Sequence, residues 1–271
     1  MSVTTFCHIV GMSRQNFYKS RRTRKQLAID EEFVLGLVRQ QRCKHPFIGV
    51  RKLYYMLGDE FFMAGVRLGR DRLFRLLGSN GLLVKRGHRS VRTTYSGHRL
   101  RVYGNVLRDT VLSGPCQAVE SDITYIRTDE GFMYLALVMD CYSRAVLGYD
   151  CSDSLESQGT LRALSMALHK VGDTKGMIHH SDRGIQYCSG DYIKKLNKHG
   201  VVISMTEENH CYENSQSERL NGILKHEYGL GSRFKTKNEA RRAVAEAIEL
   251  YNSWRPHQSL GYKCPMEVHA A

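Results

Sequence analysis

Apolar residues alternate or recur at helical spacing along most of the chain, and their period changes at about residue 113. After that point the runs CQAVESDITYIRT, FMYLALVMD and RAVLGYDCS predict three strands, with a tight turn at TDEG. A helix over LESQGTLRALSMALHKVG, a short strand at MIHHS, a helix at GDYIKKLNKHG and a short strand at VVISM follow. Two further helices close the chain. This order predicts a single α/β unit over residues 113–271, with a mixed sheet flanked by helices.

The first third of the chain is predicted to be helical. Residues 1–26 predict a short helical segment with a turn near Gly11 and Ser13. Residues 27–84 predict a small all-α domain. Helical spacing there places apolar residues on one face of each helix, first Ile29, Phe33, Leu37 and Val38, then Val50, Leu53, Tyr54 and Leu57, and last Leu73, Leu76 and Leu77.

The last of these helices carries Arg70, Arg72 and Arg75 on or near its outer side. Two helices of which the second is rich in arginine suit a helix-turn-helix, whose later helix enters the major groove of DNA. The alternative is an ordinary helical bundle with a solvated basic face.

The net charge of +13 is unevenly distributed. Residues 1–101 hold 21 Lys and Arg against 6 Asp and Glu, whereas the remainder is almost neutral. Residues 85–112 mix basic residues with Gly, Ser and Thr and predict a linker, in which Lys85, Arg86 and Arg89 would contact phosphates. The alternative is a linker that is only solubilising. The asymmetry favours a polyanionic partner, and DNA is the best candidate.

Composition narrows the class of protein further. The 8 cysteines include no CxxC pair, which argues against a disulfide framework and against structural zinc. No apolar run is long enough for a membrane span, and the N-terminus has no signal-peptide pattern. We therefore expect a cytoplasmic protein with reduced thiols, no zinc and no membrane partner.

Three carboxylates stand out as candidate chemistry. Asp122 lies inside the apolar strand SDITYI, where a lone acid is costly to bury unless it is paired or bound to metal. Asp182 ends the run MIHHS, and Glu218 lies in the helical segment ENSQSERLNGILKHEY, after a gap of 35 residues. Carboxylates from separate elements can converge on hard divalent cations. Such a cluster predicts phosphoryl transfer on nucleic acid.

The helix of Glu218 has one polar face. At about 100° per residue, Asn214, Asn221 and Lys225 lie within about 60° of Glu218, and the leucines and isoleucine lie opposite. We expect this face, with Tyr212 just before it, to contact DNA, and Lys225 to be solvent-facing in the free protein. A polar outer face without function is the alternative.

The strings SDITYI, HHSDRGIQY, CYENSQSERLNGILKHE and YNSWRPHQSLGYKCP resemble the catalytic core of insertion-sequence transposases, most closely the second-reading-frame product of the insertion sequence three (IS-three) family. The resemblance covers about residues 40–268. It implies a ribonuclease-H-like, integrase-type fold in which Asp122, Asp182 and Glu218 are the catalytic and metal-binding residues. It also implies a DDE transposase that uses two Mg²⁺ ions, with Mn²⁺ as a substitute.

The implied reaction is cleavage and strand transfer at the ends of the element, without a covalent protein intermediate. The expected partners are double-stranded DNA, comprising the terminal inverted repeats and the target, further copies of the chain on paired ends, and a first-reading-frame protein. Two other interpretations stay open. A catalytically silent DNA-binding regulator would not be expected to keep three acids at this spacing, and a structure-selective nuclease would lack the basic N-terminal part.

Overall fold

The computed structural model describes residues 2–84, 100–207 and 213–271. The chain divides into two compact units, Met1–Lys85 and Arg86–Ala271, which are described separately below. Four of the predicted DNA contacts, Lys85, Arg86, Arg89 and Tyr212, lie outside the described residues.

The N-terminal unit is helical, as predicted. Its helices are α1 (Val3–Ile9), α2 (Arg14–Lys44), α3 (Val50–Met56), α4 (Gly58–Met63) and α5 (Arg70–Ser79). The hydroxyl groups of Ser2 and Ser13 cap α1 and α2 by accepting from the backbone N–H groups of Thr5 and Asn16. One buried cluster holds α2 to α5 together, and Leu53, Leu73 and Leu77 are its completely buried leucines together with Leu57 at 1% exposure.

Two details of this unit differ from the sequence prediction. The expected break between residues 26 and 27 falls inside α2, which runs without interruption because the segment contains no proline. The predicted buried face was right at Val38 and partly right at Leu37, which is half-buried, but wrong at its first two positions. Val34 and Val38 are buried, whereas Ile29 and Phe33 are 53% and 41% exposed.

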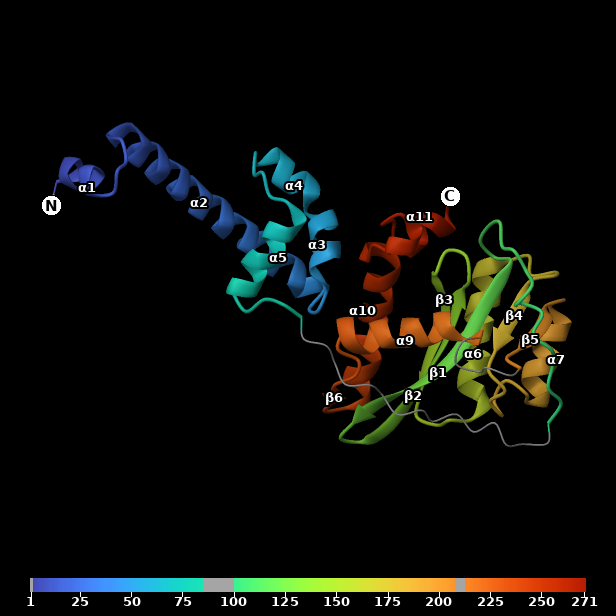
Figure 1. The fold of residues 1–271 in the computed structure, drawn as a ribbon. Coiled ribbons are helices and arrows are strands. Elements are labelled where there is room, and N and C mark those ends of the chain that lie inside the picture. Colours follow the sequence, from blue (N-terminus) through green and yellow to red (C-terminus); the bar gives the residue numbers. More distant parts are fainter. Residues whose placement is uncertain (1, 85–99, 208–212) are drawn as a thin grey trace. The chain divides into compact units, whose positions relative to one another are not determined.

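The C-terminal unit is built on one six-stranded sheet (Figure 1). Its strands are β1 (Ala118–Thr128), β2 (Gly131–Asp140), β3 (Val146–Ser152), β4 (Ile178–Ser181), β5 (Val202–Met205) and β6 (Arg233–Phe234). The order is β3-β2-β1-β4-β5, and β6 pairs with the end of β1. The first three strands form an antiparallel meander, and β4 and β5 are parallel to β1. The predicted mixed sheet is therefore confirmed.

Helices cover both faces of this sheet. On one face α6 (Ser157–Val171) and α7 (Gly190–Lys198) share a core with Val119 and Val138. On the other face α9 (Ser215–Glu227) and α10 (Lys237–Trp254) pack on Ile126 and Leu135. The alternation of side chains along β1 and β2 supplies apolar residues to both cores. The result is a three-layer arrangement in which α9 lies across β1 (Figure 1).

The chain closes with a short 3-10 helix (Gln258–Leu260) and α11 (Pro265–His269). Arg255, which precedes them, is 2% exposed and forms an ion pair with Glu227 at the end of α9, 2.8 Å long. Burial of a guanidinium is costly unless it is paired, so this bond fixes the tail to the core. Among the helices in the described residues, none combines the length and the apolar character that a membrane crossing requires.

The described part of the predicted linker is attached to the core. Gly104 accepts a backbone hydrogen bond from Met205, and the backbone N–H of Leu107 donates to the hydroxyl of Ser204, 3.2 Å away. Leu107 and Leu112 pack against a small buried cluster that includes Ile178. Residues 100–112 therefore pack against the C-terminal unit, from β5 to the start of β1.

Candidate active site

Asp122 and Asp182 are brought together by two parallel strands. Ser121 of β1 is paired with Ser181 of β4, so Asp122 and Asp182 are the next residues on neighbouring strands. Both carboxylates are half-buried. The turn after β4 holds Asp182 in place, because the backbone N–H of Gly184 donates to its Oδ1 at 2.9 Å. A side chain at Gly184 would begin 2.9 Å from that same oxygen and would displace the Asp182 carboxylate from its present position.

The electrostatics of Asp122 show the crowding of negative charge. Burial is the largest cause that raises the pKa of Asp122 to about 8, followed by the charge of Asp182 and then by those of Glu218 and Glu120. One neutral donor offsets this, since Asn221 Nδ2 donates to Asp122 Oδ2 at 2.6 Å. A carboxylate surrounded by other carboxylates needs a cation in order to stay ionised at neutral pH.

Glu218 reaches the same place from the opposite layer. It lies in the first turn of α9, which packs on β1, and its side chain is exposed. Its charge raises the pKa values of both Asp122 and Glu120, which places it within electrostatic range of β1. The charges of Asp182 and Glu218 therefore both act on Asp122, where α9 packs on β1.

Tyr187 forms part of the floor of this group. It is 2% exposed, and its hydroxyl has no hydrogen-bond partner among the described residues. Burial raises its pKa well above the usual range, and the charges of Tyr192, Asp122 and Asp182 add to the effect. The sequence prediction did not assign this buried phenol, whose pKa responds to both aspartates.

Glu120 is a fourth carboxylate that the sequence prediction missed. It is 3% exposed and lies two residues before Asp122, on the same face of β1. Both the backbone N–H and the hydroxyl of Ser217 donate to its Oε2 at 3.0 Å. Burial raises the pKa of Glu120 to about 7, against the effects of Ser217 and Arg144. The i, i+2 spacing of two acids in an apolar strand was the signal that could have revealed it.

The polar face of α9 is more buried than predicted. Asn214 and Asn221 are 4% and 8% exposed in the free protein, so their side chains are not accessible for direct contact with DNA. The expectation that Lys225 is solvent-facing is wrong, because it is half-buried. Burial lowers its pKa, while the charge of Asp122 raises it and that of Arg127 lowers it. Lys225 is therefore the cation that lies toward Asp122.

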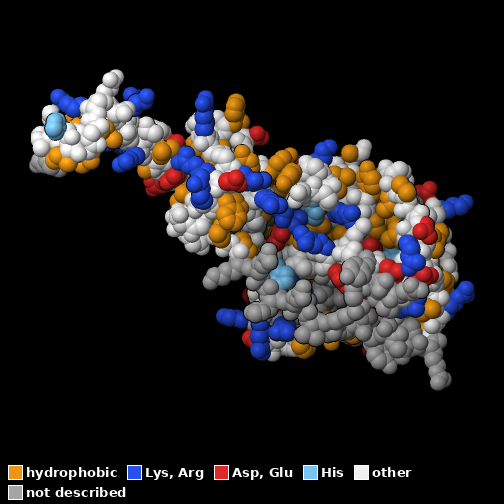
Figure 2. Space-filling view, viewed as in Figure 1, with side chains coloured by type: hydrophobic (Ala, Val, Ile, Leu, Met, Phe, Trp, Pro, Cys, Tyr) orange, Lys and Arg blue, Asp and Glu red, His pale blue; other side chains and the backbone are white. Residues whose placement is uncertain are grey.

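The arginines of α5 are largely accessible. Arg70 and Arg75 are exposed, whereas Arg72 is half-buried and donates to Glu31 of α2 at 3.1 Å. Arg70 contacts its neighbour Asp71 at 3.1 Å. Lys and Arg side chains are prominent over the visible face of this unit (Figure 2). Exposed pairs of this kind contribute little to stability, so Arg70 is available to a phosphate.

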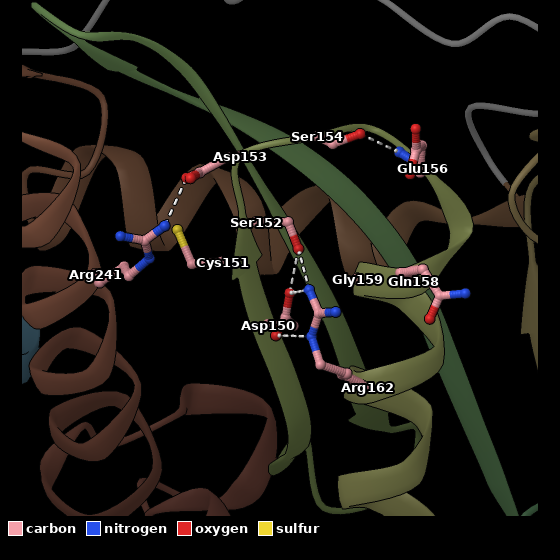
Figure 3. Close-up of a pocket in the computed structure, with 10 residues that line it drawn as sticks. All are labelled: Asp150, Cys151, Ser152, Asp153, Ser154, Glu156, Gln158, Gly159, Arg162 and Arg241. Atoms are coloured by element: carbon pink, nitrogen blue, oxygen red, sulfur yellow. Dashed lines mark hydrogen bonds and ion pairs between the residues drawn. The ribbon is translucent and has the colours of Figure 1, made fainter.

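Other acids near the sheet have structural partners. Asp140 caps the turn after β2, where the backbone N–H and the hydroxyl of Ser143 donate to its Oδ1 at 2.7 Å. Asp150 and Asp153 line a separate cavity of about 440 Å³ at the end of β3 (Figure 3). Arg162 pairs with Asp150 at 2.8 Å and Arg241 with Asp153 at 2.6 Å. The lining of this cavity includes none of the predicted catalytic residues.

Comparison with known proteins identifies the class. Sequences described as "Integrase core domain" match residues 113–211 and 199–265. Among solved structures, the simian T-cell lymphotropic virus intasome in complex with a PP2A regulatory subunit is similar in fold. It has a TM-score of 0.51 and 16% identity, covering 82% of this chain and 75% of that chain. The C-terminal unit is thus an integrase-type, ribonuclease-H-like catalytic core.

Two curated relatives extend over nearly the whole chain. A 31 kDa protein of the insertion element IS600 from Shigella sonnei is 35% identical over 96% of this chain and 95% of its own length. The transposase InsF of insertion sequence IS3A from Escherichia coli K12 is 33% identical over 97% and 92%. The chain belongs to the IS3 family of insertion-sequence transposases, as the sequence motifs predicted, and it is a DDE transposase.

Proposed function

We propose that this transposase cuts and rejoins DNA at the ends of an insertion sequence, with Asp122, Asp182 and Glu218 as its catalytic residues. The observation that carries the proposal is the placement of Asp122 and Asp182 at adjacent positions after the paired residues Ser121 and Ser181, with α9, which carries Glu218, packed on β1. Carboxylates that lie close together and have shifted pKa values are typical of active sites.

We further propose that the three carboxylates hold two Mg²⁺ ions, for which Mn²⁺ substitutes. The donor set fits, because carboxylate oxygens are the ligands of hard divalent cations and the mutual repulsion at Asp122 would be relieved by one. When bound, the metal would increase the acidity of an attacking water and stabilise the leaving 3′-oxygen.

The residues of the chain then have separate tasks. Asn221 orients Asp122 through its 2.6 Å hydrogen bond, and Glu120 anchors the start of α9, which carries Glu218. In the first step water attacks the phosphorus at the element's end and the P–O3′ bond breaks, which frees a 3′-hydroxyl. In the second step this hydroxyl attacks a phosphorus of the joining strand and expels its 3′-oxygen. Lys225 faces the phosphate beside the reacting bond.

The remaining DNA contacts belong to the N-terminal unit and the segments around it. Arg70, Arg72 and Arg75 would approach the terminal inverted repeat, with Lys85, Arg86 and Arg89 along the phosphates. We propose that Tyr212 contacts the DNA end and that the buried Asn214 and Asn221 act by positioning.

We also propose that copies of the chain assemble on paired ends, with a first-reading-frame protein as a further partner, in the bacterial cytoplasm at the nucleoid. The alternative of a catalytically silent regulator is not favoured, because the relatives of this chain include curated transposases.

The proposal is tested by variants that should lose activity while their DNA binding is unchanged. Purified protein with Asp122→Asn, Asp182→Asn or Glu218→Gln should lose cleavage and joining of labelled element ends by at least about a hundredfold, and should bind those ends within about twofold of wild type. The exposed residues Asp191 and Glu246 supply matched controls, Asp191→Asn and Glu246→Gln, which should keep full activity. A triad variant that still cleaves in Mg²⁺ would refute the assignment.

A further inference from the structure

A second group of ligand-type side chains lies where β1 begins and β2 ends. Cys116 precedes β1, Asp140 ends β2 and His269 ends α11. One sulfur, one carboxylate oxygen and one ring nitrogen from these residues all lie within 4.8 Å of one another. Asp140 is paired with Val119, three positions from Asp122, or roughly 10 Å along the strand. The group is therefore separate from the proposed catalytic carboxylates.

The imidazole of His269 is oriented by a partner behind it. Its Nδ1 lies 3.1 Å from the hydroxyl oxygen of Ser143, and that hydroxyl donates to Asp140 Oδ1 at 2.7 Å. Since the hydroxyl uses its own proton toward Asp140, it accepts from Nδ1–H. The other nitrogen, Nε2, then carries a lone pair and lies 3.8 Å from Cys116 Sγ. This is the tautomer, and the kind of outer support, that metal-binding histidines have.

The other two side chains are also fixed in position. Asp140 is completely buried, and its Oδ2 accepts one hydrogen bond, from the backbone N–H of Cys116 at 2.7 Å. A carboxylate oxygen can accept a second interaction. Cys116 has a φ of +64°, in the left-handed region that non-glycine residues rarely occupy. In that conformation the N–H of Cys116 donates to Asp140 and its thiol lies beside His269. Backbone strain of this kind is more common at binding sites than elsewhere.

We propose that Cys116, Asp140 and His269 form a Zn²⁺ site. Thiolate, imidazole and carboxylate are the three ligand types of protein-bound zinc, and three protein ligands leave a fourth position for water. The half-buried thiol and imidazole leave that position accessible. The three ligands come from segments far apart in sequence, which is why the absence of a CxxC pair gave no indication of it.

The structural effect of the ion would be a cross-link. It joins the residue before β1, the end of β2 and the C-terminal helix, so the last turn of the chain becomes fixed to the sheet. Because the ligands assemble only in the folded core, binding adds directly to the stability of the fold. The site needs none of the proposed catalytic residues.

The experiment uses the full-length, metal-free protein titrated with Co²⁺, which replaces zinc and reports thiolate ligation as a charge-transfer band in the near ultraviolet. Wild type should develop this band with one ion bound, and Zn²⁺ should abolish it by displacement. Cys116→Ser and His269→Ala should each reduce the band at least tenfold. The exposed Cys43 offers a matched control, so Cys43→Ser should leave the band unchanged. Asp122→Asn should also leave it unchanged, which separates the two sites.

Two results would overturn the proposal. One is the absence of a thiolate band in wild type, which would mean that the group is only a hydrogen-bonded network. The other is a band of full intensity in Cys116→Ser. If Cys116→Ser fails to fold, His269→Ala decides the matter, and Zn²⁺ should raise the melting temperature of wild type but not of this variant.

Discussion

At the scale of the residue, the ionised form of Asp122 is proposed to bind metal but lowers the stability of the metal-free protein. Its pKa is raised from 3.8 to about 8 in the folded protein, first by burial and then by Asp182. For a carboxyl group with a raised pKa the folded state holds the proton more tightly than the unfolded state. The related stability is fully present below the unfolded pKa and is lost as the pH rises toward 8. Metal-free protein should therefore be weakened at this residue under the conditions in which the enzyme works.

Asp122→Asn should consequently stabilise the metal-free protein while it abolishes cleavage. At pH 8 with a chelator, the variant should melt a few °C above wild type, since roughly 1 kcal/mol shifts the midpoint by about 2–4 °C in a domain of this size. The difference should shrink toward pH 4, where wild-type Asp122 is protonated in the folded protein and partly protonated in the unfolded chain. Thermal melts at the two pH values measure this. A variant that melts below wild type at pH 8 would show that ionised Asp122 does not destabilise the metal-free fold.

At the scale of the element, α9 is tied to β1 by the acids of the site. Ser217 donates to Glu120, and Asn221, one turn later, donates to Asp122. Asn214, at the N-cap of α9, makes no side-chain capping bond, so Glu120 takes the place of a cap from the neighbouring strand. The first turn of α9, which contains Glu218, is thus held by the buried carboxylate of Glu120. Glu120 does not itself need to touch DNA.

Glu120→Ala should loosen the start of α9. It leaves the N–H and the hydroxyl of buried Ser217 without their acceptor, at a cost of about 1–3 kcal/mol. Glu120→Gln keeps an acceptor oxygen and should recover most of the stability. A purely structural residue would change only the melt. We expect Glu120→Ala also to raise the Mg²⁺ concentration for half-maximal cleavage several-fold, with exposed Glu246→Ala as the unchanged control. An unaltered Mg²⁺ requirement would contradict a positioning role.

The elements differ in how well sequence predicts them. The strands and the helix of Glu218 were predictable, because apolar alternation and a polar face are local properties. The continuity of α2 was not, since residues 1–26 and 27–84 were interpreted as separate segments. The burial of Lys225 and the cap that Glu120 provides depend on how α9 lies across β1. Such packing is not encoded in the period of either element.

At the scale of the whole molecule, the basic surplus and the proposed catalytic acids lie in different parts of the chain. The basic surplus lies in residues 1–101, while the proposed catalytic acids lie beyond residue 113. Association with DNA through phosphates depends steeply on salt, whereas metal binding by the half-buried Asp122 and Asp182 is screened less. Binding and cleavage should therefore respond differently to ionic strength.

Replacing Arg70 and Arg75 together with alanine should weaken binding of duplex element ends in the full-length protein. If each arginine contacts one phosphate, the slope of log affinity against log salt should fall by about 2. Lys170 and Lys198, exposed on α6 and α7, supply a control pair with the same loss of charge. Fluorescence anisotropy over a salt series measures both. Equal slopes for the two double variants would place the DNA contacts elsewhere.

The central claim is that Asp122, Asp182 and Glu218 bind divalent metal as one site. Anomalous diffraction from crystals grown in Mn²⁺ tests it most directly, because Mn²⁺ is visible at its absorption edge and is the proposed substitute for Mg²⁺. Peaks should lie among the three carboxylates in wild type and disappear in Asp122→Asn. Well-ordered wild-type carboxylates with no peak between them at millimolar Mn²⁺, or a peak unchanged in Asp122→Asn, would contradict the account.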